Sequence, residues 1–511
     1  MLVNANSRRF LTISAILLGS VWLRFADLGK QSLFFDEAWS WATTRLSFPD
    51  LMRLSLSDPH PPLYYILLKL FLLVFPSSEF GLRALSASVS VASLAAVMMY
   101  VSSRWNTETM FYAGLLMAVS PFDIYYSQET RMYTLLGFLW VGSYISLVRT
   151  LEGDRKFLIV WPLTTIMMAW THIYGVIVAY THIMFIASYL LLRSRLKVHH
   201  QGAVDSRLLI AGSASIVLGT LPPLALLLIH SSQAAGGAWI PAPKDLLVLF
   251  LLWMTGLTPV REYFLDSTHL VLPSLAVLST NTWIAIGMAT SGFPAMWGMY
   301  TAWRRTNHRQ VEILLAIILI VLPIALVFSG GVITARRVWA LKPFLGSAYL
   351  FYIWAGVGIG SIKLPLLRKC LGVAIAIVAA MSLWPYYTTW QKSTTASAFH
   401  SLPALTDQDG VIIEPAFLSP LVFYYMGETM PAYAIVTENG NQTSLIRILP
   451  TDKDIFGLHQ RITCDELSFA RNLWVYEYNN RTRDALRNWP QCVTAKKLWV
   501  FQENQWRQLG P

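Results

Sequence analysis

The chain has 511 residues, of which 55% are hydrophobic and only 13% are charged. Because soluble domains carry about a quarter charged residues, this composition excludes an ordinary soluble globular protein. The formal net charge of +11 could suggest a nucleic-acid partner, but the lysines and arginines gather in short loops between apolar runs, as the positive-inside rule requires. We therefore expect a polytopic membrane protein that binds the lipid bilayer and no nucleic acid.

Eleven apolar runs are long enough to cross about 30 Å of hydrocarbon as helices. Two shorter runs, 63–75 and 245–257, suit re-entrant or interfacial helices, which exist at membrane depth only where protein covers them. The fold class expected is an all-α membrane protein with about eleven transmembrane helices, or up to thirteen if the short runs also cross. The eleven runs are 10–26, 82–102, 110–126, 132–149, 157–172, 174–192, 208–230, 281–303, 312–329, 338–361 and 369–389.

The charge pattern predicts a multi-pass protein with a cytoplasmic N-terminus, and we expect it in a bacterial-type plasma (inner) membrane. Arg8 and Arg9 precede the first run, and no small-residue cleavage site follows it, so we expect a retained first span. With eleven spans the basic loops alternate correctly. Thirteen would put the basic cluster at 193–207 outside, which the rule disfavours.

Two domains are expected, a transmembrane domain over 1–390 with a first exoplasmic loop at 27–62, and a soluble exoplasmic domain over 391–511. In the latter, strand-like runs at 411–414, 432–436, 473–478 and 498–501 alternate with polar turns and an apolar segment at 416–426. This pattern predicts a small α/β domain. Cys464 and Cys492 both fall in it and could form a disulfide if the domain is exoplasmic.

The first exoplasmic loop carries two adjacent carboxylates, Asp36 and Glu37, flanked by aromatic residues. Burial near apolar surface would raise the pKa of such a carboxylate and make it a candidate general base. The alternative is a pair that caps an interfacial helix, with Trp39 and Trp41 as membrane-interface anchors.

Further polar residues stand at the predicted exoplasmic ends of spans. The first loop ends in Asp58-Pro-His60-Pro-Pro-Leu-Tyr64-Tyr65, and two potential ligands two residues apart leave a divalent metal open. The next turn contains Tyr133 together with Glu129 and Arg131, and the charges of the latter two are costly at membrane depth unless paired or functional. His172 lies in the third turn, where an interfacial packing role is the simpler interpretation.

A late turn contains Arg336 and Arg337, followed by Lys342. Positive charge on the exoplasmic side breaks the positive-inside rule. A bound phosphate would explain it, since guanidinium groups bind phosphate oxygens in a bidentate way. An ion pair with a loop carboxylate is the alternative.

These stretches together resemble glycosyltransferase family 39 of the GT-C superfamily, which includes protein O-mannosyltransferases and aminoarabinose transferases. The resemblance rests on Asp36-Glu37, on the His60-Pro-Pro-Leu stretch, on 127–133 and, more weakly, on Arg336-Arg337, and it covers roughly residues 10–390. It implies a polyprenyl-phosphate-linked sugar donor, transfer at the exoplasmic face, and an acidic catalytic base that falls on Asp36. Tyr64-Tyr65 stand where members carry Lys or Gly, which shifts phosphate binding onto the arginines.

The function expected is therefore an inverting membrane glycosyltransferase for hexosyl or pentosyl groups, with Asp36 as base and Glu37 beside it. Asp58, His60, Tyr64, Glu129, Arg131, Tyr133, His172, Arg336 and Arg337 are the expected substrate-binding residues. The sequence does not specify the sugar, or whether the acceptor is a protein, a lipid or a glycan. A polysaccharide polymerase or ligase with a lipid-linked donor, and a secondary transporter, are the alternatives.

Overall fold

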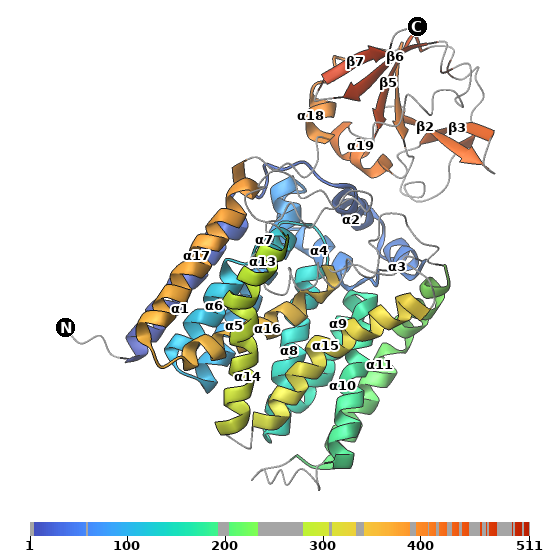
Figure 1. The fold of residues 1–511 in the computed structure, drawn as a ribbon. Helices are drawn as coiled ribbons and strands as arrows, with labels where there is room; N and C mark the ends of the chain where they lie inside the picture. Colours follow the sequence, from blue (N-terminus) through green and yellow to red (C-terminus); the bar gives the residue numbers. More distant parts are fainter. Residues whose placement is uncertain are drawn as a thin grey trace. The chain divides into compact units, whose positions relative to one another are not determined.

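The computed structural model describes residues 5–57, 60–192, 204–233, 280–305, 309–333, 342–388, 395–406, 408–414, 418–426, 432–438, 442–448, 460–461, 467, 470–477, 493, 496–502 and 505–509. The chain divides into two compact units (Figure 1). The helical unit comprises Met1–Leu28, Met52–Phe71 and Arg83–Trp390, and the sheet unit comprises Gly29–Leu51, Leu72–Leu82 and Gln391–Pro511. Part of the first loop is thus grouped with the C-terminal residues.

The helical unit is built almost entirely of α-helices, with one π-helical segment (η2) and one 3₁₀ turn (η4). Its elements are α1 (Ala5–Phe25), most of α3 (Phe48–Ser57), α4 (Leu63–Phe71), α5 (Glu79–Arg104), α6 (Thr107–Ala118), α7 (Pro121–Ser127), α8 (Tyr133–Leu151), α9 (Phe157–Thr171), α10 (Ile173–Leu192), α11 (Ser206–Gln233), α13 (Thr280–Gly287), η2 (Met288–Gly292), α14 (Phe293–Arg305), α15 (Gln310–Ile333), η4 (Lys342–Phe344), α16 (Leu345–Ser361) and α17 (Pro365–Thr388).

All eleven expected spans fall on helical segments, which confirms the predicted fold class of a helical membrane protein. Seven described segments are long and apolar enough to cross a membrane, namely α5, α8, α10, α11, α15, η4 with α16, and α17. The other four expected spans coincide with α1, with α6 and α7, with the 15-residue α9, and with α13 to α14 around the π-helical η2. The short run at 63–75 forms the nine-residue α4, whereas 245–257 lies outside the described residues.

The expected span 110–126 is broken in two. Ser120 caps α7 by accepting a hydrogen bond from the Asp123 N–H, and Pro121 begins the helix. Both residue types favour a helix start, because the serine oxygen satisfies an N–H and proline needs no partner for its own nitrogen. The break lets α7 carry a buried aspartate into contact with α1.

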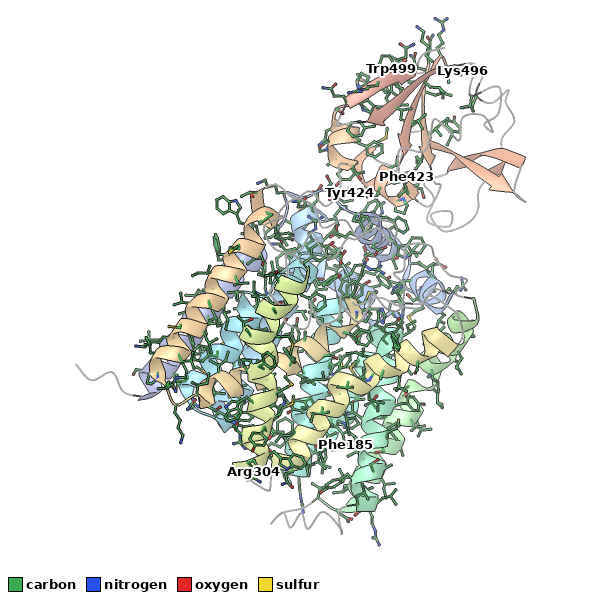
Figure 2. The ribbon with its side chains drawn as sticks, in the orientation of Figure 1. Phe185, Arg304, Phe423, Tyr424, Lys496 and Trp499 are labelled. Carbon is green, nitrogen blue, oxygen red and sulfur yellow. The ribbon has the colours of Figure 1, made fainter. Side chains whose placement is uncertain are left out.

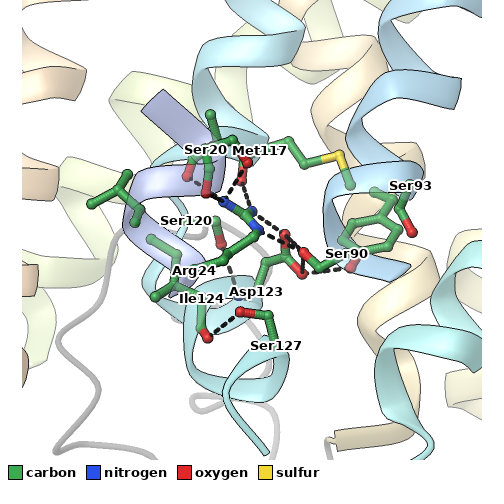
Figure 3. A network of polar contacts seen from close by, with 12 residues as sticks. Ser20, Arg24, Ser90, Ser93, Met117, Ser120, Asp123, Ile124 and Ser127 are labelled. Atoms are coloured by element: carbon green, nitrogen blue, oxygen red, sulfur yellow. Dashed lines mark hydrogen bonds and ion pairs between the residues drawn. The ribbon is translucent and has the colours of Figure 1, made fainter. Parts of the chain in front are cut away.

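Asp123 forms a buried ion pair with Arg24 of α1, and both side chains are fully buried (Figure 3). Arg24 also donates hydrogen bonds to the Ser90 and Ser20 hydroxyls (2.6 and 2.7 Å) and to the carbonyl oxygens of Met117 and Ala118 (both 3.0 Å). Such a charge is tolerated at membrane depth because every neighbour offers an oxygen. The network joins α1, α5, α6 and α7.

The same region fixes the turn after α7. The Gln128 amide donates hydrogen bonds to the carbonyl oxygens of Leu23, Arg24 and Ala26, at 3.3, 3.1 and 3.0 Å. On the other side of this turn, Ser86 of α5 donates to the carbonyl of Arg131 at 3.1 Å. The backbone that carries Arg131 is therefore held by α1 and α5.

The helix α16 is buried on nearly all sides, as expected of a helix that is apolar all round. Its glycines allow close approach of neighbouring backbones. A Cβ atom at Gly358 would lie 1.8 Å from the carbonyl oxygen of Pro294 in α14, and one at Gly356 would lie 2.5 Å from the Ala113 nitrogen in α6. Small residues at such crossings are typical of membrane helix packing.

The sheet unit confirms the small α/β fold expected for the C-terminal residues. Its seven-stranded sheet has the order β4-β3-β2-β1-β5-β6-β7. The four central strands β2, β1, β5 and β6 are parallel, and β3, β4 and β7 are antiparallel additions at the edges. The strands are β1 (Asp409–Glu414), β2 (Ala432–Glu438), β3 (Gln442–Ile448), β4 (Gln460–Arg461), β5 (Asn472–Glu477), β6 (Lys497–Gln502) and β7 (Gln505–Leu509).

The first loop folds as part of this unit. It contributes α2 (Phe35–Arg45), which packs with α18 (Thr395–His400) and α19 (Ser419–Met426). Ala38, Trp41 and Ala42 of α2 belong to one apolar core with residues of β1 and α19. Two hydrogen bonds also connect the first loop to the C-terminal residues. The Leu33 N–H donates to the Tyr425 hydroxyl (2.7 Å), and the Ala396 N–H donates to the Ser32 hydroxyl (3.2 Å).

Candidate active site

Arg131 lies at the centre of a polar cluster in the helical unit. Its side chain is 3% exposed. One terminal nitrogen donates to the Tyr65 hydroxyl at 3.3 Å, and the other lies 3.0 Å from Nε2 of His60. Because a guanidinium has only donors, the His60 Nε2 accepts this hydrogen bond. The turn before α8 thus meets the start of α4, so two motifs about 70 residues apart form one site.

His172, at the turn between α9 and α10, joins this cluster. Its ring lies edge-on to that of His60, with centroids 5.6 Å apart, and 6.0 Å from the ring of Tyr133. Nδ1 of His172 accepts the Tyr174 N–H at 3.1 Å. The other nitrogen of the neutral imidazole therefore carries the proton and can donate.

The cluster is electropositive. Lys342 lies with its Nζ atom 5.6 Å from the centre of the Tyr133 ring, a cation–π distance. Burial lowers the pKa of His172 well below its usual range, and the electrostatic influence of its neighbours His60, Arg131 and Lys342 lowers it further. His172 is therefore neutral at physiological pH, while Arg131 and Lys342 supply positive charge. Such a cluster can hold an anion.

Tyr64 and Glu129 line the same region but differ in environment. The Tyr64 hydroxyl forms a 3.1 Å hydrogen bond with Ser86, which also binds the Arg131 carbonyl, so Tyr64 supports the backbone of the turn. Glu129 is fully buried, and its carbonyl accepts the Arg131 N–H at 2.7 Å. The tyrosine that contacts the guanidinium is Tyr65.

Asp36 and Glu37 lie at the start of α2 in the sheet unit. The Glu37 carboxylate is fully buried and accepts the Phe34 N–H at 3.0 Å, so it caps the helix. Asp36, one residue earlier, is partly exposed. The capping interpretation thus accounts for Glu37, whereas Asp36 is the carboxylate that a substrate could reach.

Several predicted residues lie outside the described part of the chain. These are Asp58, Arg336, Arg337 and the cysteines Cys464 and Cys492. Within the described ranges, no group of three or more His, Cys, Asp or Glu side chains could hold a metal ion.

Tyr65 and Lys342 are the site residues that the motifs missed. Tyr65 was visible as a departure from the family pattern, because it replaces a residue type that would bind phosphate. Lys342 was visible as a positive charge near a predicted exoplasmic end, but it fell inside the expected span 338–361. In the structure it opens the 3₁₀ turn η4, before the buried helix begins.

Part of the chain matches a known family, and its fold is similar to solved structures. Residues 59–225 match the family described as dolichyl-phosphate-mannose-protein mannosyltransferase. No curated protein sequence matches the chain. The crystal structure of ArnT from Cupriavidus metallidurans in the apo state is similar, with a TM-score of 0.50, 12% identity, and coverage of 85% of this chain and 94% of that chain.

Two further solved structures are similar. ArnT from the same organism bound to undecaprenyl phosphate has a TM-score of 0.50 and 11% identity, with 84% of this chain and 93% of that chain covered. The apo oligosaccharyltransferase of Archaeoglobus fulgidus is more distant, with a TM-score of 0.48, 12% identity, and 82% and 64% coverage.

The fold is therefore that of a polytopic membrane protein of the GT-C type. The resemblance to glycosyltransferase family 39 is confirmed over residues 59–225, a segment that contains His60, the 127–133 motif and His172 but not Asp36-Glu37 or Arg336-Arg337.

Proposed function

We propose that the chain is a membrane glycosyltransferase that transfers a sugar from a polyprenyl phosphate to an acceptor at the exoplasmic face. The observation that carries the proposal is the Arg131 cluster, in which Arg131 and Lys342 supply positive charge beside His60 and His172. Arg131, His60 and His172 lie within the family-matched segment 59–225, and Lys342 lies beyond it. The similar ArnT protein was crystallised with undecaprenyl phosphate. A phosphate is the ligand that this chemistry favours.

The leaving group explains why such a cluster is needed. When the anomeric carbon–oxygen bond breaks, negative charge grows on the lipid phosphate, and preorganised donors stabilise it in the transition state. In our proposal Arg131 and Lys342 hold the phosphate, with Arg336 and Arg337 as further ligands. His60 and His172 orient the guanidinium and donate to phosphate or sugar oxygens, and Tyr64, Tyr133 and Glu129 shape the pocket wall. Asp58 is proposed as a further substrate-binding residue from the sequence.

Asp36 acts in this proposal as the general base. It takes the proton of the acceptor hydroxyl as the new oxygen–carbon bond forms and the bond to phosphate breaks, which releases polyprenyl phosphate. One base and no covalent intermediate imply inversion at the anomeric carbon. The partial exposure of Asp36 supports this role over Glu37, whose carboxylate is used as a cap.

The orientation we propose puts the N-terminus in the cytoplasm of a cell with a bacterial-type inner membrane, and the sheet unit outside. It rests on the basic loops at 104, 149–156, 193–207, 304–309 and 363–369, which would then all be cytoplasmic. The Arg131 cluster would face the exoplasmic leaflet. Sugar identity, acceptor and any metal requirement are decided by experiment.

The test uses purified full-length protein in detergent with radiolabelled polyprenyl-phosphate sugars. We expect the wild type to release the sugar to an acceptor or to water. Asp36→Asn should lower kcat by about 10²–10⁴-fold, and Arg131→Gln should weaken donor use by about 10²–10³-fold. Asp50→Asn, on the same loop, and Arg149→Gln, at the far end of α8, are matched controls that should retain activity.

Two results would contradict the proposal. Full turnover by Asp36→Asn would remove Asp36 as base while leaving the donor class intact. No turnover of any lipid-linked monosaccharide would favour the polymerase, ligase or transporter alternatives, which lipid-linked oligosaccharides and solute-uptake assays then separate. Proton NMR of the product shows whether the anomeric configuration is inverted.

A further inference from the structure

A second pocket lies at the opposite end of the helical unit from the Arg131 cluster. It has a volume of about 230 Å³ and lies between α5, α6, α14 and α16. Its lining includes Trp105, Asn106, Thr109, Thr301, Arg309 and Ser361. Lys342 stands just before α16 and Ser361 ends it. At 1.5 Å per residue this 17-residue helix separates the two sites by about 25 Å.

Beside this pocket lies an ion-pair network in which, among the described residues, Arg309 makes no direct salt bridge. Arg104 pairs with Glu312 at 2.6 Å and with Glu152 at 2.7 Å, so it engages both carboxylates. Arg309 has no ion pair with any carboxylate in the described part of the chain. Its guanidinium lies 4.3 Å from the centre of the Trp105 ring and donates to the Arg104 carbonyl at 2.8 Å.

Arg309 thus places a positive side chain in the lining of a cavity whose other lining residues are neutral. Asn106, Thr109, Thr301 and Ser361 supply hydroxyl and amide groups around it. A cationic fork surrounded by neutral donors suits an anionic phosphoryl group. A cation would be repelled, and an apolar ligand would leave the guanidinium poorly solvated.

The depth of the pocket distinguishes a lipid from a soluble anion. Trp297, Tyr300 and Trp303 lie on the same stretch of α14 as Thr301, and they are 50%, 54% and 39% exposed. Exposed tryptophan and tyrosine on membrane helices gather at the level of the lipid headgroups. Arg304, labelled in Figure 2, follows them at this end of the unit. The pocket thus lies where a headgroup would be.

We infer that this pocket binds the phosphate headgroup of an anionic phospholipid, with Arg309 as the principal ligand. The inference is independent of the proposed transferase function, because no residue is shared between the two sites. Basic pockets between membrane helices are a known way to recognise such headgroups.

The experiment measures binding of phosphatidylglycerol to purified full-length protein in a neutral detergent, by native mass spectrometry and by the shift in melting temperature. Arg309→Gln should weaken phosphatidylglycerol binding by about tenfold or more, the effect of losing one hydrogen bond to a charged group. Ser361→Leu keeps the guanidinium but fills the pocket, and should weaken binding similarly. Arg304→Gln removes an exposed charge from the same end and should bind as the wild type does.

Melting temperatures without lipid show that each variant is folded. Phosphatidylcholine should bind at least about tenfold more weakly, because its headgroup has no net charge to compensate Arg309. Equal binding by wild type, Arg309→Gln and Ser361→Leu would overturn the inference, as would equal loss in the Arg304 variant. Competition by millimolar inorganic phosphate alone would instead identify a soluble anion site and overturn the assignment to a lipid.

Discussion

The buried pair of Arg24 and Asp123 should hold the helical unit together at the point where its active-site turn begins. In Asp123→Asn the Arg24 side chain, which has no exposed surface, keeps its charge but loses its counter-ion. The hydroxyls of Ser20 and Ser90 and two backbone carbonyls still accept from it. These acceptors are neutral, so they offset only part of the loss.

Breaking a buried ion pair by removing one partner typically costs about 3–5 kcal/mol. We expect the lower part of that range for Asp123→Asn, about 3 kcal/mol, because the neutral acceptors remain. Tyr349 makes the effect larger, since its hydroxyl donates to Asp123 Oδ1 at 2.5 Å and must compete for the single amide oxygen. The free energy of unfolding is measured by titration with a denaturing detergent in mixed micelles.

A double-mutant cycle separates the ion pair from general packing. Arg24→Met with Asp123→Leu removes both charges, so the double variant should lose less stability than the sum of the single variants. Asp154→Asn, an exposed aspartate in the loop before α9, should change stability by less than about 0.5 kcal/mol. A loss below about 1 kcal/mol in Asp123→Asn, or strict additivity in the cycle, would refute the assigned role of the pair.

Three further predictions follow from the same geometry. Gly358→Val should lower the melting temperature strongly, because a Cβ atom there would lie 1.8 Å from the Pro294 carbonyl oxygen. The control Gly19→Ala, where a Cβ atom would have nothing within 4 Å, should leave the melting temperature unchanged or raise it. Equal melting temperatures for the two variants would contradict the close α14–α16 packing. Lys342→Met should weaken lipid-phosphate binding at least about tenfold by equilibrium binding, and unchanged binding, or an equal loss in the exposed control Lys363→Met, would contradict its role. Although partial burial opposes it, hydrogen bonds from Thr406, Asn472 and Trp474 hold the pKa of Asp409 below its ordinary value. Because the pKa of Asp409 is lower in the folded than in the unfolded chain, Asp409 stabilises the fold above its unfolded pKa and loses this effect as pH falls through its folded pKa. The difference in stability between wild type and Asp409→Asn should therefore shrink in acid. A difference that widens in acid would contradict the lowered pKa.

The helices were predicted well because a membrane span can be recognised from the length and apolarity of its sequence alone. Four strands of the C-terminal domain were also predicted, since β1, β2, β5 and β6 are short apolar runs. The antiparallel strands β3, β4 and β7 were not predicted. The sequences of β3 (Gln442–Ile448) and β7 (Gln505–Leu509) mix polar and apolar residues, so they lack the continuous apolar runs of the central strands.

The break between α6 and α7 was missed although its signals were present. Ser120 followed by Pro121 is a helix-start signature, and Asp123 lay inside an apolar run where a charge needs a partner. The apolar residues on both sides outweighed these local signs. Arg24, in the last turn of α1, is the partner of Asp123. The two residues are 99 positions apart in the sequence, so local patterns could not reveal the ion pair.

The site was predicted in its parts and not in its assembly. His60, Arg131, Tyr133 and His172 were expected on one side of the membrane, and the structure brings them together in the helical unit. Local patterns could not show that Arg131 contacts Tyr65, because that contact depends on how α4 packs beside the turn before α8. Nor could they show that the Asp36 segment packs with residues 360 positions later.

That last feature bears on how the protein is made. Asp36 emerges from the ribosome early, but α2 has its apolar core completed by α18, α19 and β1, which follow some 360 positions later. During synthesis the helix that bears Asp36 has no partner to fold against until those residues arrive. The helices can therefore enter the membrane long before the Asp36 segment can fold. A ribosome that stalls before residue 395 would leave an inserted protein whose Asp36 segment lacks its folding partner.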